Sequence, residues 1–199
     1  MLDFQQNIQL EDDRCLLRPL SQADEQDLLP FSLNEPEIWK YSLVGANGRE
    51  NLKAYLTAAE QSRNSGREYA FIVFDKKFGQ YAGSSRWYDI QAEQLTLKLG
   101  YTWYGKNFQG SGLNQHCKYL MLAYVFEKMN FARVEFRADA RNERSIAAMK
   151  SIGCTVEGIL RSDSKCSDGS RRDSIVLSIL NSEWKDHVKD HLMRKCNAV

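Results

Sequence analysis

The stretch Leu99–Asn114, LGYTWYGKNFQGSGLN, is the part of the sequence that decides the fold. It begins as a strand, continues as a short aromatic loop, and ends in a glycine-spaced turn ahead of a long apolar helix. Such a turn directs free backbone N–H groups and the positive end of the helix dipole at one place. The sequence therefore predicts a site for a phosphate-bearing ligand at the start of the helix.

The glycine turn itself, QGSGLN at Gln109–Asn114, matches neither of two common phosphate loops. A Walker loop would continue with Gly-Lys-Ser or Gly-Lys-Thr, and a dinucleotide fingerprint would have a third glycine. Taken alone, Gly110 and Gly112 are equally well explained by a tight loop that needs positive φ angles. The phosphate site therefore depends on support from the rest of the chain.

Size and hydrophobic pattern predict one mixed α/β (α+β) domain. The chain has 199 residues, of which 43% are apolar and 11% aromatic, enough for a sizeable core. We expect a single domain over 1–199, with its core at about 8–182 and a polar, helical C-terminal tail at 183–199.

Charge and cysteine usage narrow the class of protein. The net charge is +1, and the 27 basic and 26 acidic side chains are interspersed, which argues against nucleic acid as a direct partner. No apolar run approaches the ~20 residues that span a bilayer, and the acidic N-terminus is not a secretory signal. The five cysteines lack a CxxC pair and show no zinc-ligand spacing with the histidines. We therefore expect a cytoplasmic protein with reduced thiols, no metal and no membrane partner.

The elements follow from apolar periodicity. The strands are expected at Ile8–Leu10 (resuming at Cys15–Leu17), Tyr69–Phe74, Tyr81–Ile90, Leu95–Tyr101, Arg133–Ala138, Thr155–Leu160 and Ser174–Leu180. The helices are expected from Ser21 to about Phe31, from Pro36 to near Tyr41, and at Glu50–Asn64, Leu113–Met129 and Asn142–Ile152. The middle strands should form an antiparallel meander, and the later strand–helix alternation implies parallel pairing. The sum is a central, twisted, mixed but mostly antiparallel sheet of about seven strands, with helices on both faces.

A second informative segment, NERSIAAMKSIGC, occupies Asn142–Cys154. A strand ends just before it, Asn142 caps a helix, and Gly153 ends that helix. Ser145 lies one turn in. Local structure alone explains the asparagine and the glycine, so this segment by itself does not establish a function.

Together and in this order, the two segments resemble the GNAT superfamily of N-acetyltransferases. Within it, the chain is most similar to the branch that acetylates the N-terminal alanine or serine of ribosomal proteins. The resemblance spans about Leu16 to Trp184 and includes LLRPLSQAD, LNEPEIWKY, EGILR and DSIVLSIL. It implies the GNAT fold and the transfer of an acetyl group from acetyl-CoA to a primary amine by direct attack.

The resemblance assigns acetyl-CoA to the glycine turn. The family pattern there is Gln or Arg, two residues, Gly, one residue, then Gly or Ala; Gln109 and Gly112 match it, whereas Asn114 departs from it. By analogy, the backbone amides of Gln109–Asn114 hold the pyrophosphate, and the strand end Leu99–Tyr101 pairs with the pantetheine arm like an added strand. The cofactor-binding residues implied are Leu99, Gly100, Tyr101, Gln109, Gly110, Ser111, Gly112, Leu113, Asn114, Asn142 and Ser145.

The catalytic residues implied by the resemblance are Asn142 and Ser145, which match the family's Asn-x-x-Ser beside the thioester. Asn142 would hydrogen-bond the pantetheine or an ordered water, and the Ser145 hydroxyl would donate a proton or hydrogen bond to the departing thiolate. A backbone N–H at the end of the Leu97–Tyr101 strand could stabilise the oxyanion. Arg144 and Lys150 are candidates for the 3′-phosphate, with solvated surface charge as the alternative.

The general base is the weakest part of the match. A proposed glutamate base of the ribosomal branch aligns with Ser164, next to Asp163; Glu68, Glu93 or a chain of waters are alternatives. Because an α-amine (pKa ~8) lies nearer neutral pH than a lysine (pKa ~10.4), we expect weakly basic amines to be preferred.

The acceptor groove should be walled by aromatic residues of the early helices and the meander. The candidates are Trp39, Tyr41, Arg86, Trp87 and Tyr88. Arg86 could meet a carboxylate or carbonyl of the acceptor, whereas an aromatic core with a surface arginine is the alternative. A protein N-terminus is the favoured acceptor. The rivals are a small-molecule amine (an antibiotic, polyamine or amino acid) and a catalytically silent acyl-CoA-binding module. In the family that the chain resembles, the exposed ends of the sheets of two chains often pair. A homodimer is therefore an alternative to a monomer.

Overall fold

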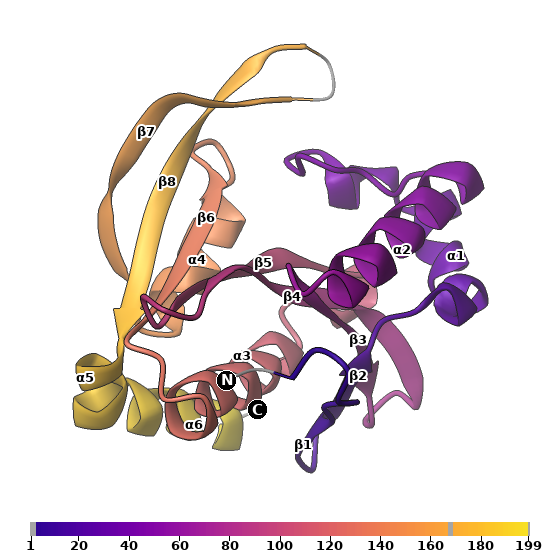
Figure 1. Cartoon of the computed structure of the whole chain (residues 1–199). Coiled ribbons are helices and arrows are strands. Elements are labelled where there is room, and N and C mark those ends of the chain that lie inside the picture. Colours follow the sequence, from indigo (N-terminus) through magenta and orange to yellow (C-terminus); the bar gives the residue numbers. More distant parts are fainter. Residues whose placement is uncertain (1–2, 167–168, 199) are drawn as a thin grey trace.

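The computed structural model describes residues 3–166 and 169–198, and the remaining residues of the expected domain, 1–199, lie outside these ranges. Its strands form a single twisted sheet (Figure 1). They are β1 Leu10–Glu11, β2 Cys15–Pro19, β3 Tyr69–Asp75, β4 Gln80–Gln91, β5 Thr96–Tyr104, β6 Arg133–Asp139, β7 Thr155–Lys165 and β8 Arg171–Leu180.

The strand order across the sheet is β1-β2-β3-β4-β5-β6-β8-β7. Every neighbouring pair is antiparallel except β5 and β6, which run parallel. The predicted mixed, mostly antiparallel sheet with its β3–β5 meander is therefore confirmed; the strand beyond the expected seven is the two-residue β1. The expected parallel pairing is limited to one pair, because β8 lies between β6 and β7 and runs antiparallel to both.

The helices cover both faces of this sheet. The α-helices are α1 Glu25–Asn34, α2 Arg49–Asn64, α3 Leu113–Ala123, α4 Glu143–Ser151, α5 Asn181–Glu183 and α6 Lys189–Asn197. Short 3₁₀ helices lie at Gln22–Asp24, Pro36–Trp39 and Lys106–Phe108, and π-helical turns lie at Tyr124–Lys128 and Trp184–Val188. Within the described ranges, no helix is long and apolar enough to cross a membrane.

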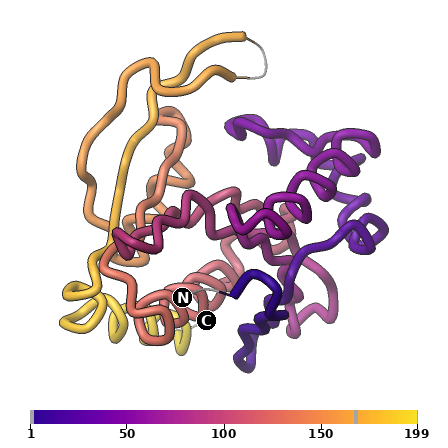
Figure 2. Tube along the Cα trace, in the orientation of Figure 1, coloured from indigo at the N-terminus to yellow at the C-terminus, as the bar shows by residue number. Residues whose placement is uncertain are grey.

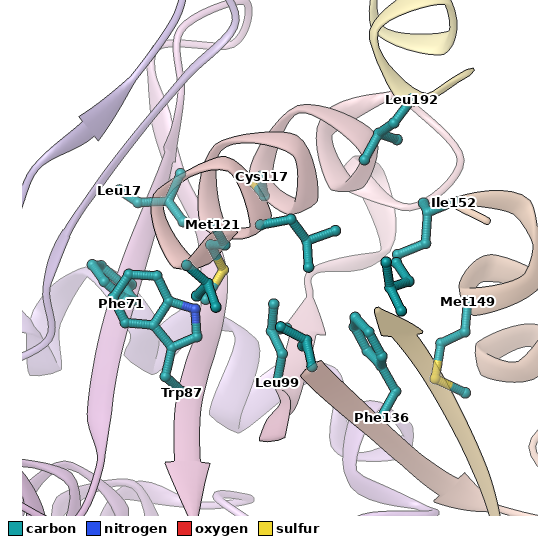
Figure 3. Close-up of a cluster of buried hydrophobic side chains, with 14 of the residues drawn as sticks. Leu17, Phe71, Trp87, Leu99, Cys117, Met121, Phe136, Met149, Ile152 and Leu192 are labelled. Atoms are coloured by element: carbon teal, nitrogen blue, oxygen red, sulfur yellow. The ribbon is translucent and has the colours of Figure 1, made fainter. Parts of the chain in front are cut away.

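Two hydrophobic clusters, one on each face, follow from side-chain alternation along the strands. On β3, Phe71 and Val73 belong to the larger cluster with α3, α4 and α6, whereas Ala70 and Ile72 belong to the smaller one with α1 and α2. Figure 3 shows part of the larger cluster, in which the side chains of α3 meet those of the strands.

The C-terminal segment, expected as a polar tail, is helical and packs into this larger cluster. Trp184, Val188 and Leu192 recur every four residues and are each at most 1% exposed. This spacing puts them on one helical face, so that a segment of polar composition still contributes to the core. Val199, the last residue of the expected tail, lies outside the described ranges.

Strands β5 and β6 separate after a short parallel pairing, which joins Thr96–Lys98 to Arg133–Glu135. Beside this point β5 contains a bulge, because Ser84 opposes Trp103 while Arg86 opposes Gly100. Tyr101, inside the bulge, has a φ of 49°. In Figures 1 and 2 the β7–β8 hairpin extends as an arm beyond β6, next to the gap between β5 and β6.

Candidate active site

A cavity of about 560 Å³ opens where β5 and β6 separate. Twelve of the predicted cofactor, catalytic and acceptor residues line it: Trp39, Tyr41, Tyr88, Leu99, Gly100, Tyr101, Gln109, Gly110, Gly112, Asn114, Asn142 and Ser145. The structure therefore gathers the glycine turn, the Asn-x-x-Ser segment and three acceptor candidates around one space, although they come from different elements.

The glycine turn has the geometry expected of an anion site. Gly110 and Gly112 have φ angles of 71° and 87°, in the left-handed region that favours glycine, and α3 begins directly after them. No hydrogen bond from the backbone N–H groups of residues 110–114 occurs within the described part of the chain. These groups, at the positive end of a helix, suit a diphosphate.

Gln109 takes a different part from the one predicted. Its backbone N–H donates to the Lys106 carbonyl (3.1 Å), so it is not available to a pyrophosphate. Its side chain braces the turn instead: Nε2 donates to the Tyr104 carbonyl (2.8 Å), and Oε1 accepts from Arg144. The backbone N–H of Gln109 is engaged because it forms the last hydrogen bond of the 3₁₀ turn at Lys106–Phe108.

Ser111 and Leu113 do not line the cavity. The Ser111 hydroxyl donates to the Phe108 carbonyl (2.7 Å), and the Leu113 side chain is fully buried in the core. Their predicted role, which involves only their backbone N–H groups, stays a prediction. The Ser111 carbonyl accepts from Arg14 Nη1 (3.2 Å), and Arg14 is itself paired with the buried Asp75 (2.8 Å). This anchor of the turn joins distant parts of the chain, and sequence reasoning missed it.

Asn142 and Ser145 lie at the start of α4, as predicted. The Asn142 side chain caps the helix by accepting from the Ser145 backbone N–H (3.1 Å). In the part of the chain described here, the Ser145 hydroxyl and Asn142 Nδ2 have no hydrogen-bond partner. Both polar groups are therefore free to meet a bound molecule.

The acceptor candidates divide into two groups. Trp39, Tyr41 and Tyr88 line the cavity. Trp39 packs on Trp103 with ring centroids 5.3 Å apart, and Tyr88 meets Tyr101 edge-on at 5.0 Å. These rings give the cavity a partly aromatic lining.

Trp87 does not line the acceptor groove, so this prediction is wrong. Its side chain is fully buried on the other face of β4 and packs against Phe71, with ring centroids 4.8 Å apart (Figure 3). On the same face it stacks on Tyr124, with centroids 5.4 Å apart. Adjacent strand residues point to opposite faces, so Tyr88 and Trp87 could not share one wall.

Arg86 is also withdrawn from the cavity. It lies between the rings of Tyr55 and Tyr101, 5.1 Å and 4.6 Å from their centroids, and is 5% exposed. Its Nη1 atom is 2.5 Å from Glu68 Oε2. The predicted contact with an acceptor carboxylate is therefore wrong, because the guanidinium already has a carboxylate, and the same ion pair occupies Glu68.

The remaining base candidates are weak bases or lie elsewhere. Asp163 and Ser164 do line the cavity. Burial favours a raised pKa for Asp163, but hydrogen bonds from Ser174 and Ser164 and the charge of Arg137 outweigh it, so the pKa is lowered. Glu93 is exposed in the turn between β4 and β5, away from the cavity.

The two candidates for the 3′-phosphate are separated. Arg144 lines the cavity beside the glycine turn, where it reaches Gln109. Lys150 borders a different hollow, together with His187 and His191. The geometry therefore keeps Arg144 as a candidate and removes Lys150 from the cavity.

One lining residue that the sequence reasoning did not select is Lys118. Its side chain is nearly fully buried, and Nζ donates to the hydroxyls of Ser85 (2.9 Å) and Thr102 (2.7 Å). Burial lowers the pKa of Lys118 to about 7. The signal in the sequence was its spacing: a lysine four residues after Asn114, in an otherwise apolar stretch of helix, faces the same side as the glycine turn.

Comparison with known proteins agrees with this geometry. The family described as Acetyltransferase (GNAT) domain matches residues 14–155. A "Putative ribosomal N-acetyltransferase YdaF" from Bacillus subtilis (strain 168) is 29% identical over 116 residues, which make up 58% of this chain and 61% of that protein.

Solved structures share the whole fold. A "putative acetyltransferase" from T. thermophilus is 30% identical with a TM-score of 0.87, covering 98% of this chain and 99% of the other. The ribosomal-protein-S5-alanine acetyltransferase from Vibrio fischeri is 19% identical with a TM-score of 0.72, covering 89% and 99%. The chain therefore belongs to the GNAT family of acetyltransferases and is an acyltransferase.

Proposed function

We propose that this acyltransferase moves the acetyl group of acetyl-CoA to the α-amino group of a protein N-terminus, as a ribosomal-protein type of enzyme. One observation carries the proposal: a single cavity is lined by the glycine turn, by Ser145 and by Trp39 and Tyr41. It offers N–H groups for an anionic donor, aromatic side chains for an acceptor, and a hydroxyl in the same space.

The donor site suits coenzyme A. The free N–H groups of residues 110–114 would hold the pyrophosphate. Beyond Lys98, none of the described strands pairs with β5 on the β6 side, so the backbone at Gly100 and Tyr101 is open to an extended, amide-rich arm. The pantetheine of coenzyme A is such an arm.

The cavity supports direct transfer rather than a covalent enzyme intermediate. A neutral amine would attack the thioester carbonyl, and Ser145 would donate a hydrogen bond to the departing thiolate. Cys117 and Cys154 are buried, and burial raises the pKa of the Cys154 thiol. A thiol with a raised pKa is a poor nucleophile at neutral pH.

The acceptor class is inferred from proton energetics and from likeness to the ribosomal relatives. Deprotonating an α-amine of pKa ~8 at pH 7 costs about 1.4 kcal/mol, against about 4.6 kcal/mol for a lysine side chain of pKa ~10.4. The cavity carboxylates Asp139 and Asp163 have lowered pKa values and are therefore weak bases. Arg137 and Arg172 also line the cavity, which disfavours a polyamine.

A thiol-release assay with acetyl-CoA and a panel of amines tests this function. We expect release with peptides that begin with alanine or serine, and little with the same peptides when the α-amine is blocked and only a lysine is free. Faster turnover of the lysine or of a polyamine would contradict the acceptor class. Tight coenzyme A binding without any amine-dependent release would indicate a silent binding module.

A further inference from the structure

Lys118 occupies an unusual position for a lysine. It extends from α3 to Ser85 of β4 and to Thr102 in the bulge of β5, and it lines the cavity together with Asn114 and Gln115. The residue is only 5% exposed. Its two hydrogen-bond partners, Ser85 and Thr102, are neutral hydroxyls, and it has no ion pair with a carboxylate among the residues described.

A buried ammonium without a counter-charge is unstable, so the neutral amine is favoured here. The titratable groups that face Lys118 are the thiols of Cys117 on its own helix and of Cys154 after α4, and both act weakly in the opposite direction. On strands β4 and β5, its hydrogen-bond partners are the hydroxyls of Ser85 and Thr102. The pKa of Lys118 is accordingly lowered to about 7.

Four other titratable groups that line the cavity have pKa values shifted away from neutral pH. Burial raises the pKa values of Tyr88 and Tyr101. The carboxyls of Asp139, hydrogen-bonded to Arg141, and of Asp163 have lowered pKa values. In contrast to these four groups, Lys118 has a pKa that is shifted toward neutral pH. Its hydrogen bond to Thr102 holds it at the bulge, where β5 and β6 separate.

We propose that Lys118 is the proton carrier of the acetyl transfer, a role that rests on the proposed function. The acceptor nitrogen bonds to the carbonyl carbon and the carbon–sulfur bond breaks. The proton that the nitrogen loses moves to the neutral Nζ of Lys118, directly or through the Thr102 hydroxyl. Lys118 then gives a proton to the thiolate, so the enzyme returns to its starting state. The positive charge that Nζ gains in this step accompanies the negative charge that develops on the thioester oxygen and sulfur, which favours the transition state over the ground state.

The test compares Lys118→Met and Lys118→Arg with the unaltered enzyme in thiol-release assays from pH 5.5 to 9, with a peptide acceptor. We expect the rate in the unaltered enzyme to rise with an apparent pKa near 7. In both variants this rise of the rate around pH 7 should be absent. Their kcat should fall by at least about 100-fold, the lower end of the range for general acid–base catalysis. Arginine separates two roles, because it keeps a positive charge but cannot release its proton.

Two further measurements keep the result interpretable. Lys128→Met, at an exposed lysine beyond the end of α3, is the matched control and should keep full activity. Coenzyme A binding by each variant checks its fold. In the unaltered protein labelled with nitrogen-15 lysine, a signal that is missing in Lys118→Met should titrate near pH 7.

Three outcomes would overturn the proton-carrier role. A Lys118 signal that titrates above pH 9 would do so whether or not the variants fold. Full activity of Lys118→Met or Lys118→Arg with an unchanged pH profile would do so and leave the acetyltransferase function standing. If the unaltered enzyme releases no thiol with any amine, the proposed function fails, and the role fails with it.

Discussion

Lys118 and Ser145 reach the same cavity from different helices, and their side chains have different energetic costs. Ser145 presents a hydroxyl that has no partner in the described structure, next to a cap that Asn142 completes. Lys118 is buried with only hydroxyl partners, which costs folding free energy whenever it is protonated. Each residue therefore makes its own prediction.

Replacing Lys118 by methionine should stabilise the protein in a pH-dependent way. The folded-state pKa, about 7, lies below the unfolded value, so the unfolded chain binds more protons between the two. The loss of folding free energy caused by burying Lys118 is therefore complete below pH 7, and it disappears as the pH rises through the lysine's unfolded pKa of ~10.4. We expect Lys118→Met to raise the Tm at pH 7 by several degrees and to lose most of this advantage at pH 10. A rise in Tm that is equal at pH 7 and pH 10 would contradict the burial of Lys118 without a counter-charge.

Ser145→Ala should lower kcat by roughly 10- to 100-fold, the value of one hydrogen bond to a charged group. Because the hydroxyl has no protein partner in the described structure, stability and coenzyme A affinity should hardly change. Ser145→Thr, which keeps the hydroxyl, should recover most of the rate. Equal rates for the alanine and threonine variants would remove Ser145 from the chemistry.

At the scale of elements, the sequence predicted the glycine turn and the two helices behind the cavity well. Their boundaries follow from glycine, capping and periodicity, which are local signals. The bulge at Tyr101 and the anchoring of the turn by Arg14 depend on contacts between distant strands. Local patterns do not contain that information. The engaged amide of Gln109 is different, because it closes the local 3₁₀ turn at Lys106–Phe108, where the sequence predicted only a loop.

Gly110→Ala tests the turn as an element. A methyl group at Gly110, where φ is +71°, would meet no protein atom within 4 Å and would lie in the proposed anion site. Gly79→Ala is a matched control, because Gly79 has a φ of +64° and equally open surroundings in the β3–β4 turn. Both should lose about 1 kcal/mol of stability. Coenzyme A affinity, measured by calorimetry, should fall about tenfold or more only for Gly110→Ala, and equal affinities would contradict the site.

At the scale of the whole molecule, the sheet class and the meander were predictable, whereas the position of β8 between β6 and β7 was not. Strand order depends on which edge remains open when the last hairpin folds, and periodicity does not report it. The same limit applies to Trp87: alternation separates it from its neighbours, but only the packed sheet shows which face is the core. The homodimer remains a prediction.

The acceptor preference is a property of the whole cavity and of the pH. We expect the ratio of α-amine to lysine turnover to be largest near pH 7 and to shrink as the pH rises toward 9.5, because the lysine then needs less help with its proton. Competition between two peptides, analysed by mass, measures this ratio directly. A ratio below one at pH 7 would contradict it.

Isothermal calorimetry of the unaltered protein with coenzyme A and with acetyl-CoA, at two temperatures, tests the donor site directly. We expect one site per chain for both ligands, with weaker binding in Gly110→Ala than in Gly79→Ala. Absence of binding for both ligands would show that the N–H groups ahead of α3 do not hold a diphosphate, and the proposed donor site would be wrong.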